Sequence, residues 1–373
     1  MKLSVCMIMK NEEKWIEQCL KSIHGIADEI VIVDTGSTDK SIEIAKHYSA
    51  IIKKDKWRFD FSYHRNQSID MATGDWLLFI DADERLLGNV QELKMWLKTV
   101  PSDCSALTVK MEDIQAGQVA MRFNPPKIFR TGKVKFENIV HNKAMIDGKI
   151  GHCDIVFYQH YGYDLDAKQR QAKVDRTTVL LKKRLKKNQK DYEAHFYLSQ
   201  QYGWSGNVET AIKHANEYLK NKDNIGKEFN KSVYFSAARM CMTLERFEEA
   251  KMWIESGLKE IPNDLDLALA LCELGNLTNN IGLMAIGAQN YCKIYKQFEN
   301  ISKTKGAHFT HSYKPEAFAF CSFNLGVAQV KQGMLTLAAM NEALSKSPPA
   351  FKAEIMKNID VNLNQSGLQR IET

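Results

Sequence analysis

Residues 29–39 have the sequence EIVIVDTGSTD, in which an apolar run ends at an acidic residue and a polar turn follows. A short β-branched run of this kind is typical of a strand buried in a parallel sheet. Ser37, Thr38 and Asp39 are residue types that cap helices, and an apolar helical face begins at Ile42. The stretch therefore predicts the strand, turn and helix of an α/β fold.

The same alternation of strand and helix extends over the first third of the chain. Residues 3–9 and 76–81 form two further short apolar runs. Between the first run and residue 29 there is a helical face, made of Ile16, Cys19, Leu20 and Ile23. This order implies a mostly parallel, Rossmann-like sheet with right-handed crossovers, whose ligands bind at the carboxyl ends of the strands. We expect an α/β domain over residues 1–165, closed by short strands between residues 106 and 160.

From about residue 165 onward the apolar pattern is helical. Small and aromatic residues recur there at the spacing of a tetratricopeptide unit. The phased sets are Tyr202, Gly206 and Ala211, then Ala250 and Pro262, and then Leu325, Gly333 and Ala338. Each helix pair can bury its apolar face only against a neighbour, so the units should stack. We expect an all-α, tetratricopeptide-like repeat domain over residues 166–373, with a degenerate unit around residues 265–297.

Composition narrows the class of protein. The net charge of +6 over 373 residues permits an anionic partner without demanding one, and we expect no nucleic-acid partner. No apolar run reaches the length of about 20 residues that a transmembrane helix needs. The eight cysteines include no CxxC pair, which favours a reducing compartment over disulfides. We expect a cytoplasmic protein, or one that lies peripherally at the inner face of the membrane.

A basic stretch follows the α/β domain. Between residues 168 and 190 there are ten lysines and arginines and a single acidic residue, Asp175. One interpretation is a solvated linker helix whose buried side carries Val179, Leu180, Leu181 and Leu185. The other is a surface for an anionic acceptor or an anionic membrane.

Asp81 and Asp83 directly follow the apolar run 76–80. Two carboxylates at the end of a buried strand repel each other and lose hydration unless a cation lies between them. Oxygen ligands favour Mg²⁺ or Mn²⁺, which would also bind a diphosphate. The alternative is a solvated acidic turn that includes Glu84.

Two further polar residues suit a nucleotide. Asp34 ends the strand of residues 29–34, where its carboxylate can accept the N3–H of a uracil, although the neighbouring residues can simply cap the next helix. Arg65, near the start of another helix, can bind phosphate oxygens, and its alternative is a surface ion pair.

Taken together, four ordered motifs resemble glycosyltransferase family 2, which has the GT-A fold. They are KNEE at 10–13, DEIVIVDTGSTD at 28–39, DFS at 60–62 with RN at 65–66, and DADE at 81–84. The chain is most similar to the branch that carries tetratricopeptide repeats, which includes the sublancin-type bacteriocin S-glycosyltransferases. This resemblance implies a UDP-sugar donor, and the residues expected to bind it are Asn11, Glu12, Asp34, Arg65 and Asp81.

The resemblance also implies a reaction and its machinery. Asp81, Asp83 and His160 would hold Mg²⁺ or Mn²⁺ while the sugar moves in a single displacement with inversion. The residues considered for catalysis are Glu112, Asp113 and Glu137, as candidates for the base, and His141. His141 stands where the family usually has His-Glu, but Asn142 follows it here, and asparagine is no useful proton acceptor.

The acceptor remains open between a peptide Cys, Ser or Thr and a bacterial envelope glycan. The repeat domain would hold this acceptor or form a homodimer. The rival hypothesis is a catalytically impaired repeat scaffold that only binds a nucleotide sugar or a protein partner.

Overall fold

The computed structural model describes residues 1–162, 166–220, 227–302 and 315–331. The chain divides into two compact units, Met1–Arg184 and Leu185–Thr373. Helix α5 (Ala167–Lys187) extends across the limit between them. The functional boundary predicted at residue 165 stays a prediction.

The first half of the N-terminal sheet is parallel. Its strands β1 (Leu3–Met9), β2 (Glu29–Asp34), β3 (Ile51–Lys54) and β4 (Trp76–Phe79) lie in the order β3-β2-β1-β4. β1 and β2 begin and end where the sequence predicts them. β4 ends two residues before the predicted limit, because the N–H of Asp81 donates to the Glu84 side chain instead of to a neighbouring strand.

The second half of the sheet is mixed, with the order β4-β8-β6-β11-β5, and β7 pairs with β6. Its strands are β5 (Glu84–Gly88), β6 (Cys104–Gln115), β7 (Gln118–Phe123), β8 (Pro126–Arg130) and β11 (Lys149–His160). β6 and β11 are parallel, whereas β8 and β5 are antiparallel to their neighbours. A separate hairpin contains β9 (Val134–Glu137) and β10 (Lys143–Ile146). The expected short strands between residues 106 and 160 are therefore present.

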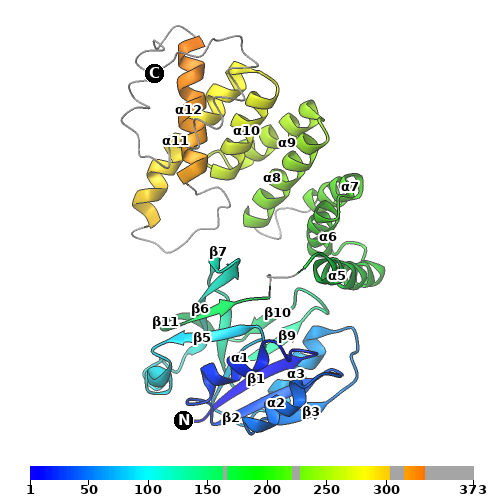
Figure 1. The fold of residues 1–373 in the computed structure, drawn as a ribbon, viewed down its shortest axis with the longest axis vertical. Coiled ribbons are helices and arrows are strands. Elements are labelled where there is room, and N and C mark those ends of the chain that lie inside the picture. Colours follow the sequence, from blue (N-terminus) through cyan, green and yellow to red (C-terminus); the bar gives the residue numbers. More distant parts are fainter. Residues whose placement is uncertain (163–165, 221–226, 303–314, 332–373) are drawn as a thin grey trace. The chain divides into compact units, whose positions relative to one another are not determined.

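Two cores cover the two faces of this sheet. On one face, α1 (Ile16–Ile23) and α2 (Ser41–His47) contribute their apolar sides to the larger core. On the other face, Phe79, Phe129 and Phe136 pack together, and the end of α3 (Phe61–Met71) packs against them. Figure 1 shows these helices beside the strands. The fully buried residues of α1 are the four that the sequence predicts.

The C-terminal unit is helical throughout its described residues. Its helices are α6 (Tyr192–Trp204), α7 (Val208–Leu219), α8 (Lys227–Thr243), α9 (Phe247–Glu260), α10 (Leu265–Leu277), α11 (Ile281–Ser302) and α12 (Pro315–Lys331) (Figure 1). Ala211 and Ala250, the phased small residues, are fully buried in α7 and α9. Gly333 and Ala338 of the third phased set lie outside the described residues. The predicted fold class, an α/β domain of the GT-A type followed by an all-α region, is confirmed. Among the described helices, none has the length and apolarity to cross a membrane.

Candidate functional site

The carboxyl ends of β1 and β2 are joined by polar side chains. The Asn11 side chain accepts a hydrogen bond from the Thr38 N–H at 2.8 Å, and the Ser37 hydroxyl accepts one from the Asn11 N–H at 2.9 Å. Asp34 is 1% exposed and accepts from the N–H groups of Gly36 and Ser37, both at 3.1 Å. The carboxylate of Asp34 thus shapes the turn that follows β2, which places Asn11 and Asp34 at one edge of the sheet.

Glu12 lies at the same edge and is half-buried. Its N–H donates to the Ser41 hydroxyl at 2.7 Å, which fixes the chain just after β1. Burial, followed by the negative charges of Asp83 and Asp81, raises the pKa of Glu12 to about 7. Glu12 therefore shares one electrostatic environment with the aspartates that follow β4.

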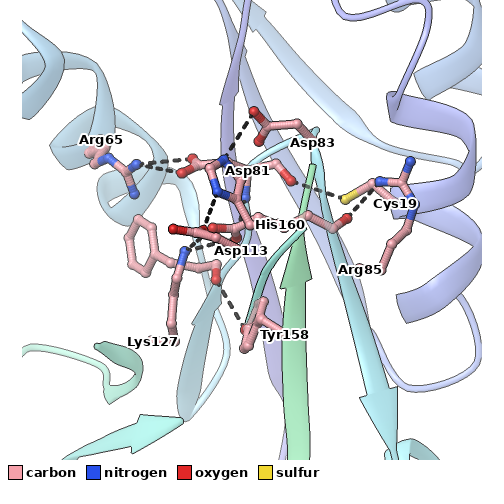
Figure 2. A network of polar contacts seen from close by, with 11 residues as sticks. Cys19, Arg65, Asp81, Asp83, Arg85, Asp113, Lys127, Tyr158 and His160 are labelled. Atoms are coloured by element: carbon pink, nitrogen blue, oxygen red, sulfur yellow. Dashed lines mark hydrogen bonds and ion pairs between the residues drawn. The ribbon is translucent and has the colours of Figure 1, made fainter. Parts of the chain in front are cut away.

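Helix α3 brings Arg65 to this edge. The Asp60 side chain caps the helix by accepting from the Tyr63 N–H at 2.9 Å. Asn66 exchanges two hydrogen bonds with the backbone of Phe136 in β9, at 2.9 and 2.8 Å. Asp60 and Asn66 thus hold the helix in place, and Arg65 points toward Asp81 (Figure 2).

Arg65 and Asp81 form an ion pair, in which Nη2 lies 2.9 and 3.0 Å from the two carboxylate oxygens. Burial opposes ionisation of Asp81, but the charges of Arg65 and Lys127 outweigh it and lower the pKa of this carboxyl to about 2. The N–H of Asp81 donates to Glu84 at 2.9 Å, and Lys127 binds both oxygens of Glu84 at 2.7 and 2.8 Å. Glu84 is 3% exposed, so the alternative of a solvated acidic turn is wrong for this residue.

His160 links Asp83 to Asp113. Its Nδ1 lies 2.7 Å from Asp113 Oδ1, and its Nε2 lies 3.4 Å from Asp83 Oδ2. This follows from the sheet register, because β11 places His160 between Glu84 of β5 and Asp113 of β6. Burial disfavours the charged ring, but the contacts with Asp113 and Asp83 raise the pKa of His160 to about 10. Figure 2 shows the ring between these two aspartates.

The backbone at Gly162 lies directly against this pair. A Cβ added at Gly162 would lie 2.0 Å from Asp83 Oδ2 and 2.6 Å from His160 Nε2. Because the Tyr161 N–H also donates to the Asp83 carbonyl at 2.9 Å, the chain after β11 encloses the aspartate closely. Only glycine leaves space beside these two polar atoms.

Two carboxylates and an imidazole are donors that suit Mg²⁺ or Mn²⁺. Asp83 and His160 fit that role through the small cradle at Gly162. Asp81 is bound to Arg65 and would join them only after leaving it. In the part of the chain that the structure describes, three or more His, Cys, Asp or Glu side chains are nowhere arranged to hold a metal ion. The metal site thus stays a prediction.

The candidates for the base lie in different surroundings. Glu112 is 7% exposed and bound to Arg122 at 3.0 Å; burial acts to raise its pKa, but Arg122 and Gln159 lower it overall. Asp113 orients His160. Glu137 ends β9 with an exposed side chain. The catalytic role of each candidate base stays a prediction, and so do the roles of the other site residues.

His141 adopts a left-handed backbone conformation with φ of 47°. Burial, followed by the positive charges of Arg184 and Lys173, lowers its pKa to about 4. The ring is therefore neutral at pH 7. The catalytic role of His141 stays a prediction.

Sequence patterns did not reveal several residues that shape the site. Lys127 of β8 and Arg85 of β5 are charged residues whose side chains bind partners far away in the sequence. Lys127 binds Glu84, and Arg85 binds Gln18. Arg85 donates to the carbonyls of Ala82 and Glu84, and its guanidinium lies 5.8 and 5.5 Å from the rings of Trp15 and Tyr161. The one available signal was their charge within apolar strands, which predicts a buried partner.

Comparison with known proteins gives the site a family context. The model of the family described as "Glycosyl transferase family 2" matches residues 4–143. A TPR repeat-containing protein of Synechococcus elongatus is 31% identical over 58% of this chain and 55% of its own length. The SPbeta prophage-derived glycosyltransferase SunS of Bacillus subtilis is 28% identical over 74% of this chain and 69% of its own. The chain thus spans about half of the first relative.

Among solved structures, glucosyl-3-phosphoglycerate synthase of Mycobacterium tuberculosis, in complex with Mn²⁺, UDP and glucosyl-3-phosphoglycerate, has 22% identity and a TM-score of 0.25. That match covers 31% of this chain and 44% of the other. The family match spans the strand ends that carry Asn11, Asp34, Asp81 and Asp83, and the described residues after 166 are helical. Residues 4–143 of this chain therefore match the glycosyl transferase family 2 model, and helices follow in the described residues after 166.

Proposed function

We propose that the chain is an inverting glycosyltransferase, which uses a UDP-sugar and a divalent cation, Mg²⁺ or Mn²⁺. One observation carries this proposal: His160 Nε2 lies 3.4 Å from Asp83 Oδ2, and Asp81, two residues before Asp83, shares their electrostatic environment. Asp81 and Asp83 both lie within the family-matched residues 4–143. The resemblance to SunS, which is named a glycosyltransferase, supports the reaction type.

In the proposed reaction, an acceptor oxygen or sulfur bonds to the anomeric carbon while the bond from that carbon to the diphosphate oxygen breaks. UDP leaves with the bonding electrons, and the acceptor proton passes to a base. Asn11 and Asp34 would hold the uridine, and Arg65 would neutralise diphosphate oxygens. Asp83 and His160, with Asp81, would hold the cation, which neutralises charge on the leaving diphosphate when it is bound.

The acceptor is proposed to be a peptide Cys, Ser or Thr or a bacterial envelope glycan. The helical region would position it near the donor, since stacked repeats present extended surfaces to long partners. A homodimer through these helices is the other proposed role, and sedimentation velocity of the full chain measures it directly.

Hydrolysis of UDP-glucose with Mn²⁺ tests the donor site. Asp83→Ala should abolish turnover and keep the circular dichroism spectrum, because Asp83 serves the cation and is not part of an apolar core. EDTA should abolish wild-type turnover in the same way. Asp70→Ala, which changes an exposed aspartate of α3, is the matched control and should retain activity. Wild-type rates in Asp83→Ala would refute the proposal.

A scaffold that binds nucleotide sugar without turning it over is the second candidate. It is favoured by Asn142, which replaces a carboxylate, and by the Arg65–Asp81 ion pair, which satisfies Asp81 without a cation. UDP-glucose binding without hydrolysis, and without transfer to any peptide or glycan acceptor, would support it.

A further inference from the structure

Helix α5 follows the family-matched residues and contains most of the basic stretch. Its charged residues fall into two groups. Lys183, Lys186 and Lys187 are exposed. Lys173, Arg176 and Arg184 interact with groups of the α/β unit, although Arg176 is itself exposed. The solvated-linker interpretation therefore does not describe the whole helix.

Arg184 fixes the helix to the first unit. Its side chain is 8% exposed, and Nη1 donates to the Val140 carbonyl at 3.2 Å. Val140 directly precedes His141, in the connection between β9 and β10. The compact first unit accordingly extends to Arg184 and includes the N-terminal part of α5.

Lys173 and Arg176 are three residues apart and therefore share one face of α5. The Arg176 guanidinium lies 5.5 Å from the ring of Phe61, the first residue of the helix that carries Arg65. Desolvation lowers the pKa of Arg176, and the neighbouring carboxylate of Glu12 opposes that shift. Arg176 is thus placed between the end of β1 and the start of α3.

Lys173 is half-buried beside the acidic residues of the site. Burial lowers its pKa, while the charges of Asp83, Asp113 and Asp81 act in the opposite direction. Lys173 of α5 therefore shares the electrostatic environment of Asp81, which Arg65 binds from α3, whereas the acidic neighbour of Arg176 is Glu12. Cations from two helices thus lie near the carboxylates of Glu12, Asp81 and Asp83 at this edge of the sheet.

Such convergence has a specific consequence for a ligand. The cations balance the aspartates when the site holds protein groups alone. A divalent cation on Asp81 and Asp83 would take over that role and leave the positive side chains to bind an anion close by. The two phosphates of a nucleoside diphosphate carry the negative charge that such a set of cations would bind.

We propose that Lys173 and Arg176 of α5 bind the diphosphate of the nucleotide donor. This inference rests on the proposed function and deepens it, because it assigns part of the donor site to a helix beyond the family-matched residues 4–143. The basic stretch then has two roles. Lys173 and Arg176 would bind the diphosphate that leaves in the reaction. The later lysines, Lys183, Lys186 and Lys187, are exposed to solvent.

Calorimetric titration of the full chain with UDP and with uridine, both in the presence of Mn²⁺, tests the assignment. In Lys173→Ala/Arg176→Ala the affinity for UDP should fall by about 10- to 100-fold, since charge-assisted hydrogen bonds to the phosphates are lost. The affinity for uridine, which has no phosphate, should stay within about twofold. The Gln versions of both changes, which keep a longer and more polar side chain than Ala, should show the same split if the Ala pair unfolds.

Lys183→Ala/Lys186→Ala is the matched control, because it removes the same charge at the same spacing on the same helix. It should leave UDP affinity unchanged within about twofold. The inference is overturned if this control weakens UDP binding as much as Lys173→Ala/Arg176→Ala does. It is also overturned if UDP and uridine weaken equally or if neither changes. A wild-type chain that binds no UDP at all would instead refute the proposed function itself, and the inference with it.

Discussion

Arg65 and Asp81 are joined through a single nitrogen, Nη2, which lies 2.9 Å from Oδ1 and 3.0 Å from Oδ2 of the carboxylate. The pair satisfies Asp81 in the absence of a cation. A metal ion at Asp81 therefore has to replace Arg65, and a released guanidinium in a partly buried site needs an anion. Metal binding and diphosphate binding should thus be coupled through this pair.

The first prediction is that UDP raises the affinity for Mn²⁺, and that Mn²⁺ raises the affinity for UDP by the same factor. Arg65→Gln should weaken this coupling, because Asp81 is then open to the cation before any anion binds. Electron paramagnetic resonance of free Mn²⁺, titrated with and without UDP, measures the factor. Identical Mn²⁺ affinities in both titrations of the wild type would contradict the coupling.

Gly162→Ala should lower cation-dependent hydrolysis of UDP-glucose by at least about tenfold while the fold is retained. The new Cβ would lie 2.0 Å from Asp83 Oδ2 and 2.6 Å from His160 Nε2, so both side chains would have to move. Gly282→Ala in α11 is the control, since the nearest atom to its added Cβ is Asn280 Oδ1 at 3.4 Å. Steady-state kinetics with Mn²⁺ and far-UV circular dichroism test both variants, and an active Gly162→Ala enzyme would show that the cradle is unimportant.

The buried pair of Lys127 and Glu84 should behave as a unit in stability measurements. Lys127→Met alone leaves a buried carboxylate without its cation and should cost roughly 3–5 kcal/mol of unfolding free energy. Adding Glu84→Gln should recover part of that loss, so that the double variant is more stable than the sum of the single changes implies. Urea denaturation of the four chains completes the cycle. Strict additivity would mean that the pair does not interact.

Features that depend on neighbouring residues could be predicted from the sequence, whereas contacts between distant residues could not. β1 and β2 match their predicted limits because an apolar run and a polar turn are both local features. The proximity of Asp83 to His160 depends on β11 pairing with both β5 and β6, which no local pattern specifies. The family resemblance suggested His160, and the register explains its position.

Other features of the site were unpredictable for the same reason. Lys127 lies 43 residues from Glu84, on a strand that runs antiparallel to its neighbours. The sequence around Arg65 suggested a phosphate contact or a surface ion pair, and the structure shows a partly buried pair with Asp81. Which carboxylate Lys127 or Arg65 binds is determined by tertiary packing and not by spacing along the chain.

Acid should weaken the first unit through Glu29. Burial acts to raise the pKa of Glu29, but hydrogen bonds from Lys2, Ser4 and Thr73 outweigh it and lower the pKa from the ordinary 4.5 to about 2. Because the folded-state pKa is lower, the stabilising contribution is fully present above pH 4.5 and is lost as the pH falls toward 2. The stability difference between wild type and Glu29→Gln, measured in urea at pH 7, 5, 4 and 3, should therefore shrink below about pH 4.5.

Glu43→Gln, at an exposed position in α2, is the control for Glu29 and should give a smaller difference at neutral pH. A stability difference for Glu29→Gln that stayed constant from pH 7 to 3 would show that these hydrogen bonds do not favour the ionised carboxylate.

The last prediction concerns the base of the donor nucleotide. The Asp34 carboxylate accepts three hydrogen-bond contacts from the turn that follows β2, at 3.1 to 3.3 Å. An ionised carboxylate offers about four acceptor positions, so it can still receive one N–H from a base. Uracil presents N3–H there, whereas the N3 of cytosine is an acceptor and would oppose the carboxylate. UDP should thus bind about 10- to 100-fold more tightly than CDP, whereas GDP does not test this contact because guanine N1–H can also donate to a carboxylate. In Asp34→Asn the amide N–H can donate to cytosine N3, so the preference for UDP over CDP should narrow while the Asn oxygen still accepts from the turn. Calorimetry with UDP and CDP on both chains measures this ratio. Equal affinity of the wild type for UDP and CDP would exclude Asp34 as the residue that selects the base.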